Sequence, residues 1–153
     1  MSIDLSGTSP AAASTVAGAE ASGLAKFSAI RVDAVLQGAT AGALDVYIQR
    51  KIGPNLWVDW AHFPQLAAAA AAVAYSFTVA ATNAGTAVDN TPTATIAAIT
   101  TRGSDATPSP GLAAATLDLN HPGDHVRVVF VAGASTSAGA AQAVTITGIG
   151  PSR

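Results

Sequence analysis

The sequence predicts an all-β fold, a two-sheet antiparallel β-sandwich with jelly-roll-like topology and about eight strands. Three observations predict it. Apolar and polar residues alternate with a period of two in several short segments, as in strands that are buried on one face. Clusters of Gly, Pro, Ser and Thr separate these segments. No segment indicates a helix with comparable strength, so we expect two layers built from strands.

Residues 1–25 are predicted to form an extended N-terminal arm, and residues 26–153 the sandwich domain. The segment from Thr8 to Gly23 is rich in Ala, Ser and Gly and has almost no large side chain to bury. Ordering one residue costs about 1–2 kcal/mol, which such side chains do not offset alone. We therefore expect contacts from outside the arm to order it, as in an assembly.

From Lys26 onward, strand patterns follow one another along the chain. Gly53 and Pro54 supply the turn of a predicted hairpin, and Pro64 ends its second strand. The alanine run at 67–72 is compatible with one helical turn or with an extended stretch, since a helix this short is marginal in water. The predicted strands cover residues 30–36, 45–52, 56–63, 73–79, 93–101, 112–119, 125–132 and 142–149.

The composition predicts an assembled protein. Alanine accounts for 37 of the 153 residues, whereas Ile, Leu, Val, Phe and Trp together account for 36, so the core is built from small side chains. Charged residues make up 10 % of the chain, against about 25 % in an ordinary soluble domain. A soluble monomer normally has a charged, mixed surface. We therefore expect much of the exterior to face neighbours, as in a homo-oligomer.

The same composition argues against several classes of protein. The 7 Lys and Arg residues are scattered and form no basic stripe, so nucleic acid is not an expected partner. The absence of cysteine excludes disulfides, thiolate zinc sites and cysteine nucleophiles. The longest charge-free apolar run, residues 66–79, is shorter than the ~20 residues of a membrane span. The N-terminus also lacks the cationic start of a secretory signal, so we expect neither membrane insertion nor secretion.

Two histidines and an aspartate, His121, Asp124 and His125, lie close together in the sequence. Imidazole and carboxylate groups are natural ligands of zinc and nickel, so this segment is a candidate metal site. Pro122 and Gly123 lie between them and favour a tight turn with these side chains exposed at its tip. We favour the exposed turn, because the sequence positions no fourth ligand.

Signatures of hydrolytic enzymes are weak. No Gly-x-Ser-x-Gly turn accompanies the serines, so nothing pairs a nucleophile with His62. Asp45 and Asp59 lie on neighbouring strands of the predicted hairpin, and paired carboxylates are the machinery of glycosidases. A solvent-facing, charged strand face beside Arg50 and Lys51 is the favoured interpretation. We therefore predict a protein that is not an enzyme and binds no cofactor or metal.

The segment from Trp57 to Phe63 holds the densest group of aromatic side chains. Strand alternation places Trp57 and Phe63 on one face and Trp60 on the other. One face is expected to fill the core, since an alanine-rich core needs a few large side chains. The other is then free to stack on a sugar or to anchor a partner. Trp57, Trp60 and Phe63 are therefore the candidate partner-interface residues.

Several strand segments are distinctive when taken together, among them LDVYIQRK at 44–51, LWVDWAHFP at 56–64 and YSFTV at 75–79. With these segments the chain resembles small virion structural proteins of tailed bacteriophages. GDHVRVVFV at 123–131 and VTITG at 144–148 fit the same pattern, so the resemblance covers residues 26–149. It implies a capsid decoration (cement) or minor head protein that sits on the major capsid protein, and it implies no catalytic residues.

The expected function is therefore that of a non-enzymatic virion protein on the capsid surface, assembled in the host cytoplasm. It would bind the major capsid protein lattice, with a trimer as the favoured oligomer, and stabilise the head through many repeated modest contacts. The alternative is a carbohydrate-binding or host-adhesion β-sandwich module of a head or tail fibre, which would use exposed Trp57 or Trp60.

Overall fold

The computed structural model describes residues 1–10, 13–38, 42–80, 93–94, 104, 108, 110–133 and 140–150. These residues form eleven strands and no helix, which confirms the predicted all-β fold. The described part of the chain therefore holds no helix that is long and apolar enough to span a bilayer. The strands are β1 (Ser2–Asp4), β2 (Gly7–Thr8), β3 (Ser14–Ala21), β4 (Ala29–Leu36), β5 (Leu44–Gly53), β6 (Leu56–His62), β7 (Val73–Ala80), β8 (Thr93–Ala94), β9 (Thr116–Leu117), β10 (Val126–Ala132) and β11 (Ala141–Ile149).

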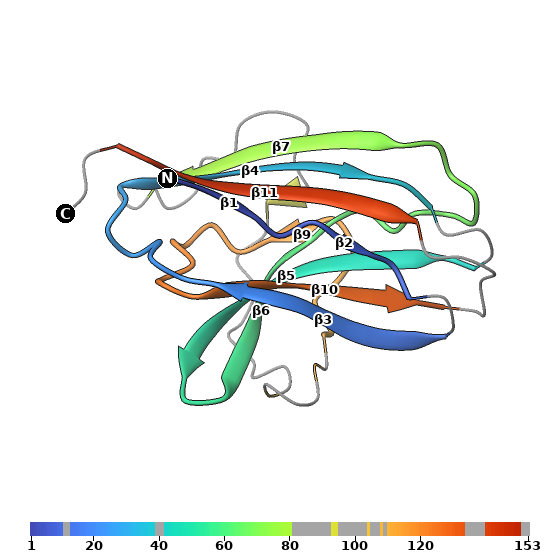
Figure 1. The fold of residues 1–153 in the computed structure, drawn as a ribbon, viewed down its shortest axis with the longest axis horizontal. Helices are drawn as coiled ribbons and strands as arrows, with labels where there is room; N and C mark the ends of the chain where they lie inside the picture. Colours follow the sequence, from blue (N-terminus) through green and yellow to red (C-terminus); the bar gives the residue numbers. More distant parts are fainter. Residues whose placement is uncertain are drawn as a thin grey trace.

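The strands pack as two facing sheets (Figure 1). One sheet has the order β1-β11-β4-β7, with β2 also paired to β11, and the other has the order β3-β10-β5-β6-β9-β8. Four antiparallel pairs are nested along the chain, with β5–β6 inside β4–β7, then β3–β10, then β1–β11. Nested pairs distributed over two sheets give the jelly roll, so the predicted sandwich is confirmed.

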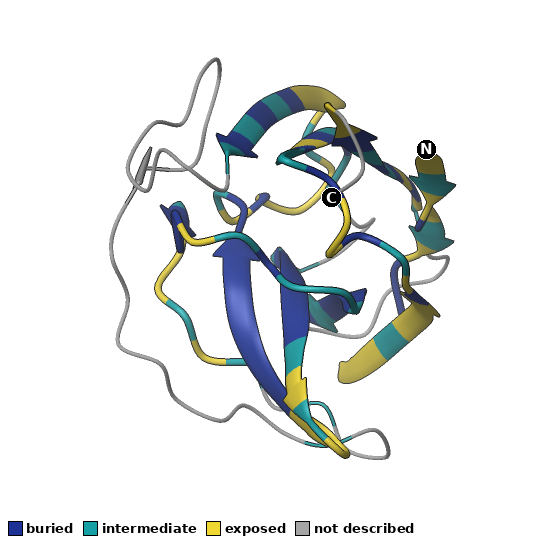
Figure 2. Ribbon diagram, turned by 90° about the vertical axis from the view of Figure 1, so that its left-hand side faces the viewer, coloured by how far each residue is buried: buried dark blue, intermediate teal, exposed yellow. Residues whose placement is uncertain are grey.

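The N-terminal residues belong to the sandwich. β1 pairs with β11 and β3 pairs with β10, while Leu5, Ala21 and Leu24 are buried in the core. The prediction of an arm over residues 1–25, separate from the domain at 26–153, is therefore wrong. That prediction considered only side-chain burial. The side chains of β3 are indeed exposed along most of its length (Figure 2), but its backbone hydrogen-bonds to β10 and holds it in the sheet.

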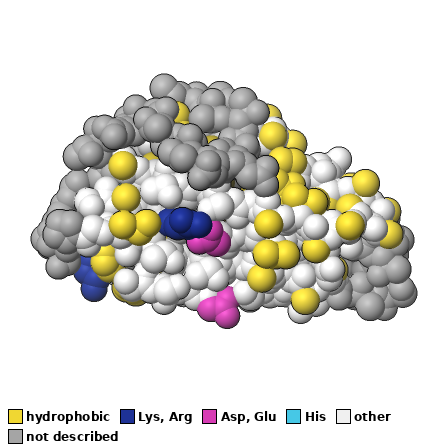
Figure 3. Space-filling model, turned by 90° about the horizontal axis from the view of Figure 1, so that it is seen from above, with side chains coloured by type: hydrophobic (Ala, Val, Ile, Leu, Met, Phe, Trp, Pro, Cys, Tyr) yellow, Lys and Arg dark blue, Asp and Glu magenta, His cyan; other side chains and the backbone are white. Residues whose placement is uncertain are grey.

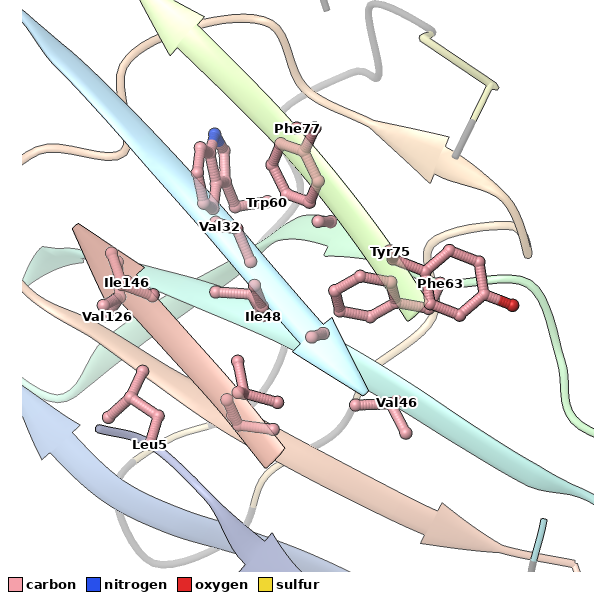
Figure 4. Close-up of a cluster of buried hydrophobic side chains, with 14 of the residues drawn as sticks. Leu5, Val32, Val46, Ile48, Trp60, Phe63, Tyr75, Phe77, Val126 and Ile146 are labelled. Carbon is pink, nitrogen blue, oxygen red and sulfur yellow. The ribbon is translucent and has the colours of Figure 1, made fainter. Parts of the chain in front are cut away.

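The core lies between the two sheets, where alternate residues of each strand point inward. In β4, Ile30, Val32, Ala34 and Leu36 are all buried, and the residues between them face outward. Figure 4 shows side chains of both sheets meeting in this layer, with the aromatic rings grouped at one side. The predicted alternation is confirmed for β4, and the same inward–outward alternation is seen in β7 and β11.

The alanine run at 67–72 is a tight turn before β7. The backbone N–H of Ala70 donates to the carbonyl of Ala67 at 3.1 Å, and Ala69 has a positive φ of 54°. Neither the helical turn nor the extended stretch that the composition allowed is formed. The carbonyl of Ala70 then accepts a bond from Gly38, which ties this turn to the end of β4.

One predicted strand is shorter than expected, and another lies mostly outside the described residues. The strand predicted at 112–119 is reduced to β9, because the backbone of Leu112 bonds to the side chains of Asp59 and His62. Of the strand predicted at 93–101, Thr93 and Ala94 form β8, and residues 95–101 lie outside the described residues.

The β5–β6 hairpin projects beyond its sheet (Figure 1). β10 pairs with β5 only as far as Arg50, and the N–H of Lys51 still donates to the carbonyl of His125 at 3.1 Å. Beyond Lys51 the pairing of β5 continues with β6, where Gly53 faces Leu56. Pro54 and Asn55 form the turn, and Asn55 has a φ of 57°. Proline in second place followed by a residue with positive φ is the combination of a type II turn. The predicted turn is confirmed.

Gly148 gives a direct test of the packing at one end of the sandwich. A Cβ atom built at Gly148 would overlap the ring of Phe27. We expect Gly148→Ala to lower the free energy of unfolding by about 1–3 kcal/mol, because the ring or the strand must move. Gly53→Ala is the matched control, since its Cβ would lie at an ordinary 3.6 Å from Leu56. Equal losses for the two variants in chemical denaturation would contradict this packing.

Candidate functional site

Trp60 and Phe63 lie in the core. Both are 0 % exposed. Their rings lie 5.7 and 6.1 Å from the ring of Phe77, and Phe63 lies 5.3 Å from Tyr75 (Figure 4). The indole N–H of Trp60 donates to the backbone oxygen of Asn120 at 2.8 Å, so its polar atom is satisfied inside the chain.

Trp57 packs outside this core cluster and is equally enclosed. The Arg127 guanidinium lies 4.2 Å from its ring centre, and the Lys51 ammonium lies at 5.2 Å, both in cation–π contact. A bulge in the β5–β6 pairing separates Trp57 from the residues that follow, so it does not share a face with Phe63 as alternation predicted. The prediction of Trp57, Trp60 and Phe63 as an interface is therefore wrong, since the chain itself covers all three.

The same holds for every aromatic side chain. The 2 Trp, 2 Tyr and 4 Phe residues of the chain are all buried, with an exposed fraction of 9 % at most. Sugar-binding sites of the stacking type need an exposed ring face. The folded chain therefore presents no aromatic platform.

A buried polar cluster lies beside Trp57. Gln49 donates to Asp59 Oδ1 at 2.8 Å, and its own side-chain oxygen accepts bonds from Arg127 at 2.8 and 3.0 Å. All three side chains belong to buried residues. Charged groups in such a place are stable only when every partner is present. The cluster therefore links three adjacent strands, β6, β5 and β10.

The buried carboxylate of Asp59 also holds a loop against β6. Its Oδ2 accepts bonds from the backbone N–H groups of Gly111 and Leu112, each at 2.7 Å. Arg127 donates to the carbonyl of Ser104 at 3.0 Å. The expectation of a solvent-facing Asp59 is wrong, because it did not foresee a loop lying over this face of the sheet.

His62 fastens the same loop to β5. Its Nδ1 lies 2.7 Å from the carbonyl oxygen of Leu112, and its Nε2 lies 3.0 Å from Asp45 Oδ1. The imidazole stacks on Tyr47 with ring centres 3.8 Å apart. Asp45 also accepts two bonds from Gln65. Each of the carboxylates Asp45 and Asp59 is therefore engaged by partners of its own, which is not the arrangement of a glycosidase pair.

The histidine segment forms a turn, but not the exposed tip that the sequence favoured, because His121, Asp124 and His125 are half-buried and Pro122 is buried. Gly123 has a φ of 84°, and its N–H donates to Nδ1 of His121 at 3.1 Å. Asp124 Oδ1 accepts bonds from the backbone of Gly23 and Ala25 at 3.1 and 3.2 Å. This turn therefore positions the connection between β3 and β4.

His125 joins this turn to β3. Its ring nitrogens lie 2.6 Å from Glu20 Oε1 and 3.1 Å from Asp124 Oδ2, and Lys51 lies 3.2 Å from Glu20 Oε2. Among the residues that the structure describes, no three His, Asp or Glu side chains are placed to hold a metal ion. The contacts of His121, Asp124 and His125 are those of a structural turn.

The outward face of the β1-β11-β4-β7 sheet carries exposed apolar side chains (Figure 3). Two open hollows of about 430 and 420 Å³ lie on it and share Val35, which is 48 % exposed, and Ala143. We name the first the β4–β7 hollow. Its lining residues are Asp33, Ala34, Val35, Ala74, Tyr75, Ser76, Ala143 and Thr145.

Asp33 brings the only charge to the lining of the β4–β7 hollow. Its carboxylate is paired with Arg31 at 2.8 Å and accepts a bond from Ser76 at 2.7 Å. Hydrogen bonding from the Arg31 guanidinium holds the pKa of Asp33 below its ordinary value. The carboxylate is therefore ionised at neutral pH, and its charge is balanced by a neighbour.

A second exposed apolar site is the tip of the β5–β6 hairpin. Ile52 and Leu56 flank the turn and are 49 % and 45 % exposed. Figure 2 shows this exposed end, at the foot of two buried strands. We call Ile52, Pro54 and Leu56 the hairpin tip.

No protein-family model, curated protein or solved structure matched this chain.

The exposed face and the hairpin tip follow from patterns present in the sequence. The small residues of β4, β7 and β11 that alternate with core residues mark the outward face, and the Gly53-Pro54 turn marks the tip. Gln49 and Arg127 were missed as members of a buried cluster. Their pattern is that of an ordinary polar strand face, and no local signal indicates that a distant loop covers it.

Asp59 should contribute far more to stability than an exposed aspartate. We expect Asp59→Ala to lower the free energy of unfolding by about 2–4 kcal/mol, since it removes a buried acceptor of three hydrogen bonds. Asp33→Ala is the control, with an expected loss below about 1 kcal/mol because its pair with Arg31 is half exposed. Urea denaturation measures both, and similar losses would refute the proposed role of Asp59.

Tyr75 should make the fold sensitive to alkaline pH. Burial raises the pKa of its phenol above the ordinary value of about 10. Because the folded chain holds this proton more tightly than the unfolded chain, the contribution is complete below pH 10 and is lost as the pH rises through the folded value. Tyr75→Phe should lose less stability than the wild type between about pH 9 and 11. If the melting temperatures of Tyr75→Phe and the wild type fell equally as the pH rises, this role of Tyr75 would be excluded.

Proposed function

We propose that this chain is a structural protein of a phage virion, a capsid decoration protein that binds the major capsid protein lattice and stabilises the head. No step of this role requires catalysis or a cofactor. The partner is a repeated protein surface, on which a modest contact gains strength because it is made many times.

The distribution of exposed apolar surface is the observation that carries the proposal. The outward face around Val35 and the hairpin tip at Ile52 and Leu56 are carried by different sheets. Exposed apolar patches of this kind mark interaction sites. A component of a lattice needs contacts to more than one neighbour. Charged residues, which would oppose such contacts, make up only 10 % of the chain.

The architecture supports the same role. Jelly rolls build many viral capsid domains, although lectin domains share the fold. The resemblance of residues 26–149 to small virion proteins favours the first of these two classes. A sugar-binding role would require an exposed ring, and all the aromatic side chains are buried. The adhesion module is therefore the weaker alternative.

Particles of the phage that encodes the chain provide the test. We expect the chain in purified particles at a fixed ratio to the major capsid protein, measured by quantitative gel densitometry. Particles from a deletion mutant should release DNA at a lower temperature, and added purified chain should restore the wild-type value. The same addition to wild-type particles is the control and should change nothing. Absence of the chain from particles, or unchanged heat resistance of the mutant, would refute the proposal.

A further inference from the structure

We propose that His62 is a doubly protonated imidazolium in the folded chain, and that its extra proton helps to hold the loop at Gly111 and Leu112 against β6. Docking of this loop then depends on pH. The inference goes beyond the proposed virion role, because it concerns the isolated chain and requires no partner. It rests on the position of one buried ring between two hydrogen-bond acceptors.

One ring nitrogen of His62 faces a group that can only accept a hydrogen bond. Nδ1 lies 2.7 Å from the backbone carbonyl oxygen of Leu112. A carbonyl oxygen has no proton to donate, so a hydrogen bond at this distance requires a proton on the ring nitrogen. The contact with Leu112 therefore places a proton on Nδ1.

The other ring nitrogen faces a carboxylate. Nε2 lies 3.0 Å from Oδ1 of Asp45. Both oxygens of Asp45 also accept from the side-chain amide of Gln65, at 3.1 and 2.9 Å, as expected of an ionised carboxylate, which only accepts. Nε2 must therefore donate as well. A neutral imidazole has a single N–H and would leave an unprotonated nitrogen against one of the two acceptors.

The surroundings of His62 favour the same charge state. Its side chain is 4 % exposed and that of Asp45 is 18 % exposed, so water reaches little of the pair and the carboxylate balances the buried cation. The ring of Tyr47 stacks on the imidazole with centres 3.8 Å apart, and an aromatic face attracts a cation. Asp45 and Tyr47 are thus the titratable groups that β5 places against His62, while Thr116, its partner on β9, is uncharged.

The loop is held at both polar atoms of the Leu112 backbone. The N–H of Leu112 donates to Asp59, and its carbonyl accepts from His62. When the imidazole loses a proton, one donor is left for two acceptors, so either the Leu112 contact or the Asp45 contact that orients the ring becomes repulsive. The proton therefore stabilises the docked loop, and its contribution is present at lower pH and is lost as the pH rises.

Nitrogen-15 NMR of the histidine rings gives the first test. At neutral pH, we expect protons on both ring nitrogens of His62. His121 is the internal control, because its Nδ1 accepts a bond from the N–H of Gly123 at 3.1 Å and so carries no proton. The variants His121→Gln and His125→Gln assign the signals of the 3 histidines by elimination, and both retain His62. An unprotonated ring nitrogen on His62 at neutral pH would overturn the proposal.

The response of the loop to pH gives the second test. The backbone amide signals of Gly111 and Leu112, which report the bonds to Asp59, should shift at the same pH at which the His62 ring loses its proton. The amide signal of Val32, buried in the other sheet, is the control and should not follow this transition. Loop signals that stay constant while His62 titrates would refute the link between the proton and the loop.

A change of Asp45 tests the source of the effect. Asp45→Asn keeps the shape of the side chain and removes its charge, so His62 should lose its proton at a pH lower by about one unit or more. Asp33→Asn is the matched control, because Asp33 is a carboxylate that is paired with Arg31 on the other sheet. Equal shifts in the two variants, or no shift in Asp45→Asn, would overturn the proposal. These experiments use the isolated chain, so their failure would leave the proposed virion role to its own test.

Discussion

Backbone hydrogen bonding between strands that are far apart in the sequence is the interaction on which the structure depends. The side chains of this alanine-rich chain bury little area individually, and β3 is exposed along most of its length. The strand stays in place because its backbone is paired with β10, as β1 is with β11. The nested pairs bring the few large side chains together, and the core cluster forms between the sheets as a result.

Both faces of β6 are used to hold the molecule together. Trp60 fills the core. Outside the core cluster, Trp57 contacts the guanidinium of Arg127, and Asp59 and His62 hold the loop at Leu112. Trp57, Asp59 and His62 therefore all make contacts that stabilise the fold. Among the described residues, exposed apolar side chains lie on the outward face of the other sheet and at the end of the hairpin, as well as on β3.

The strands with alternating side chains could be predicted from the sequence, because alternation in β4 and β7 directly reflects which face is buried. The N-terminal strands could not, since Ser14–Ala21 carries no apolar pattern and owes its place to backbone pairing. The same alternation, together with the Gly53-Pro54 pair, also indicates the outward face and the hairpin turn. The enclosure of Trp57 could not be predicted, because it depends on a bulge and on a loop from a distant part of the chain.

The pairing of β1 with β11 also constrains how the chain is made. Strands β1–β3 are translated early, yet their partners β10 and β11 follow after more than 100 residues. Closing such a long loop is slow, and unpaired strand edges are open to wrong partners in the meantime. The edges of the first strands therefore stay unpaired until the end of the chain has been made, so the topology itself lengthens the period in which wrong pairings can form.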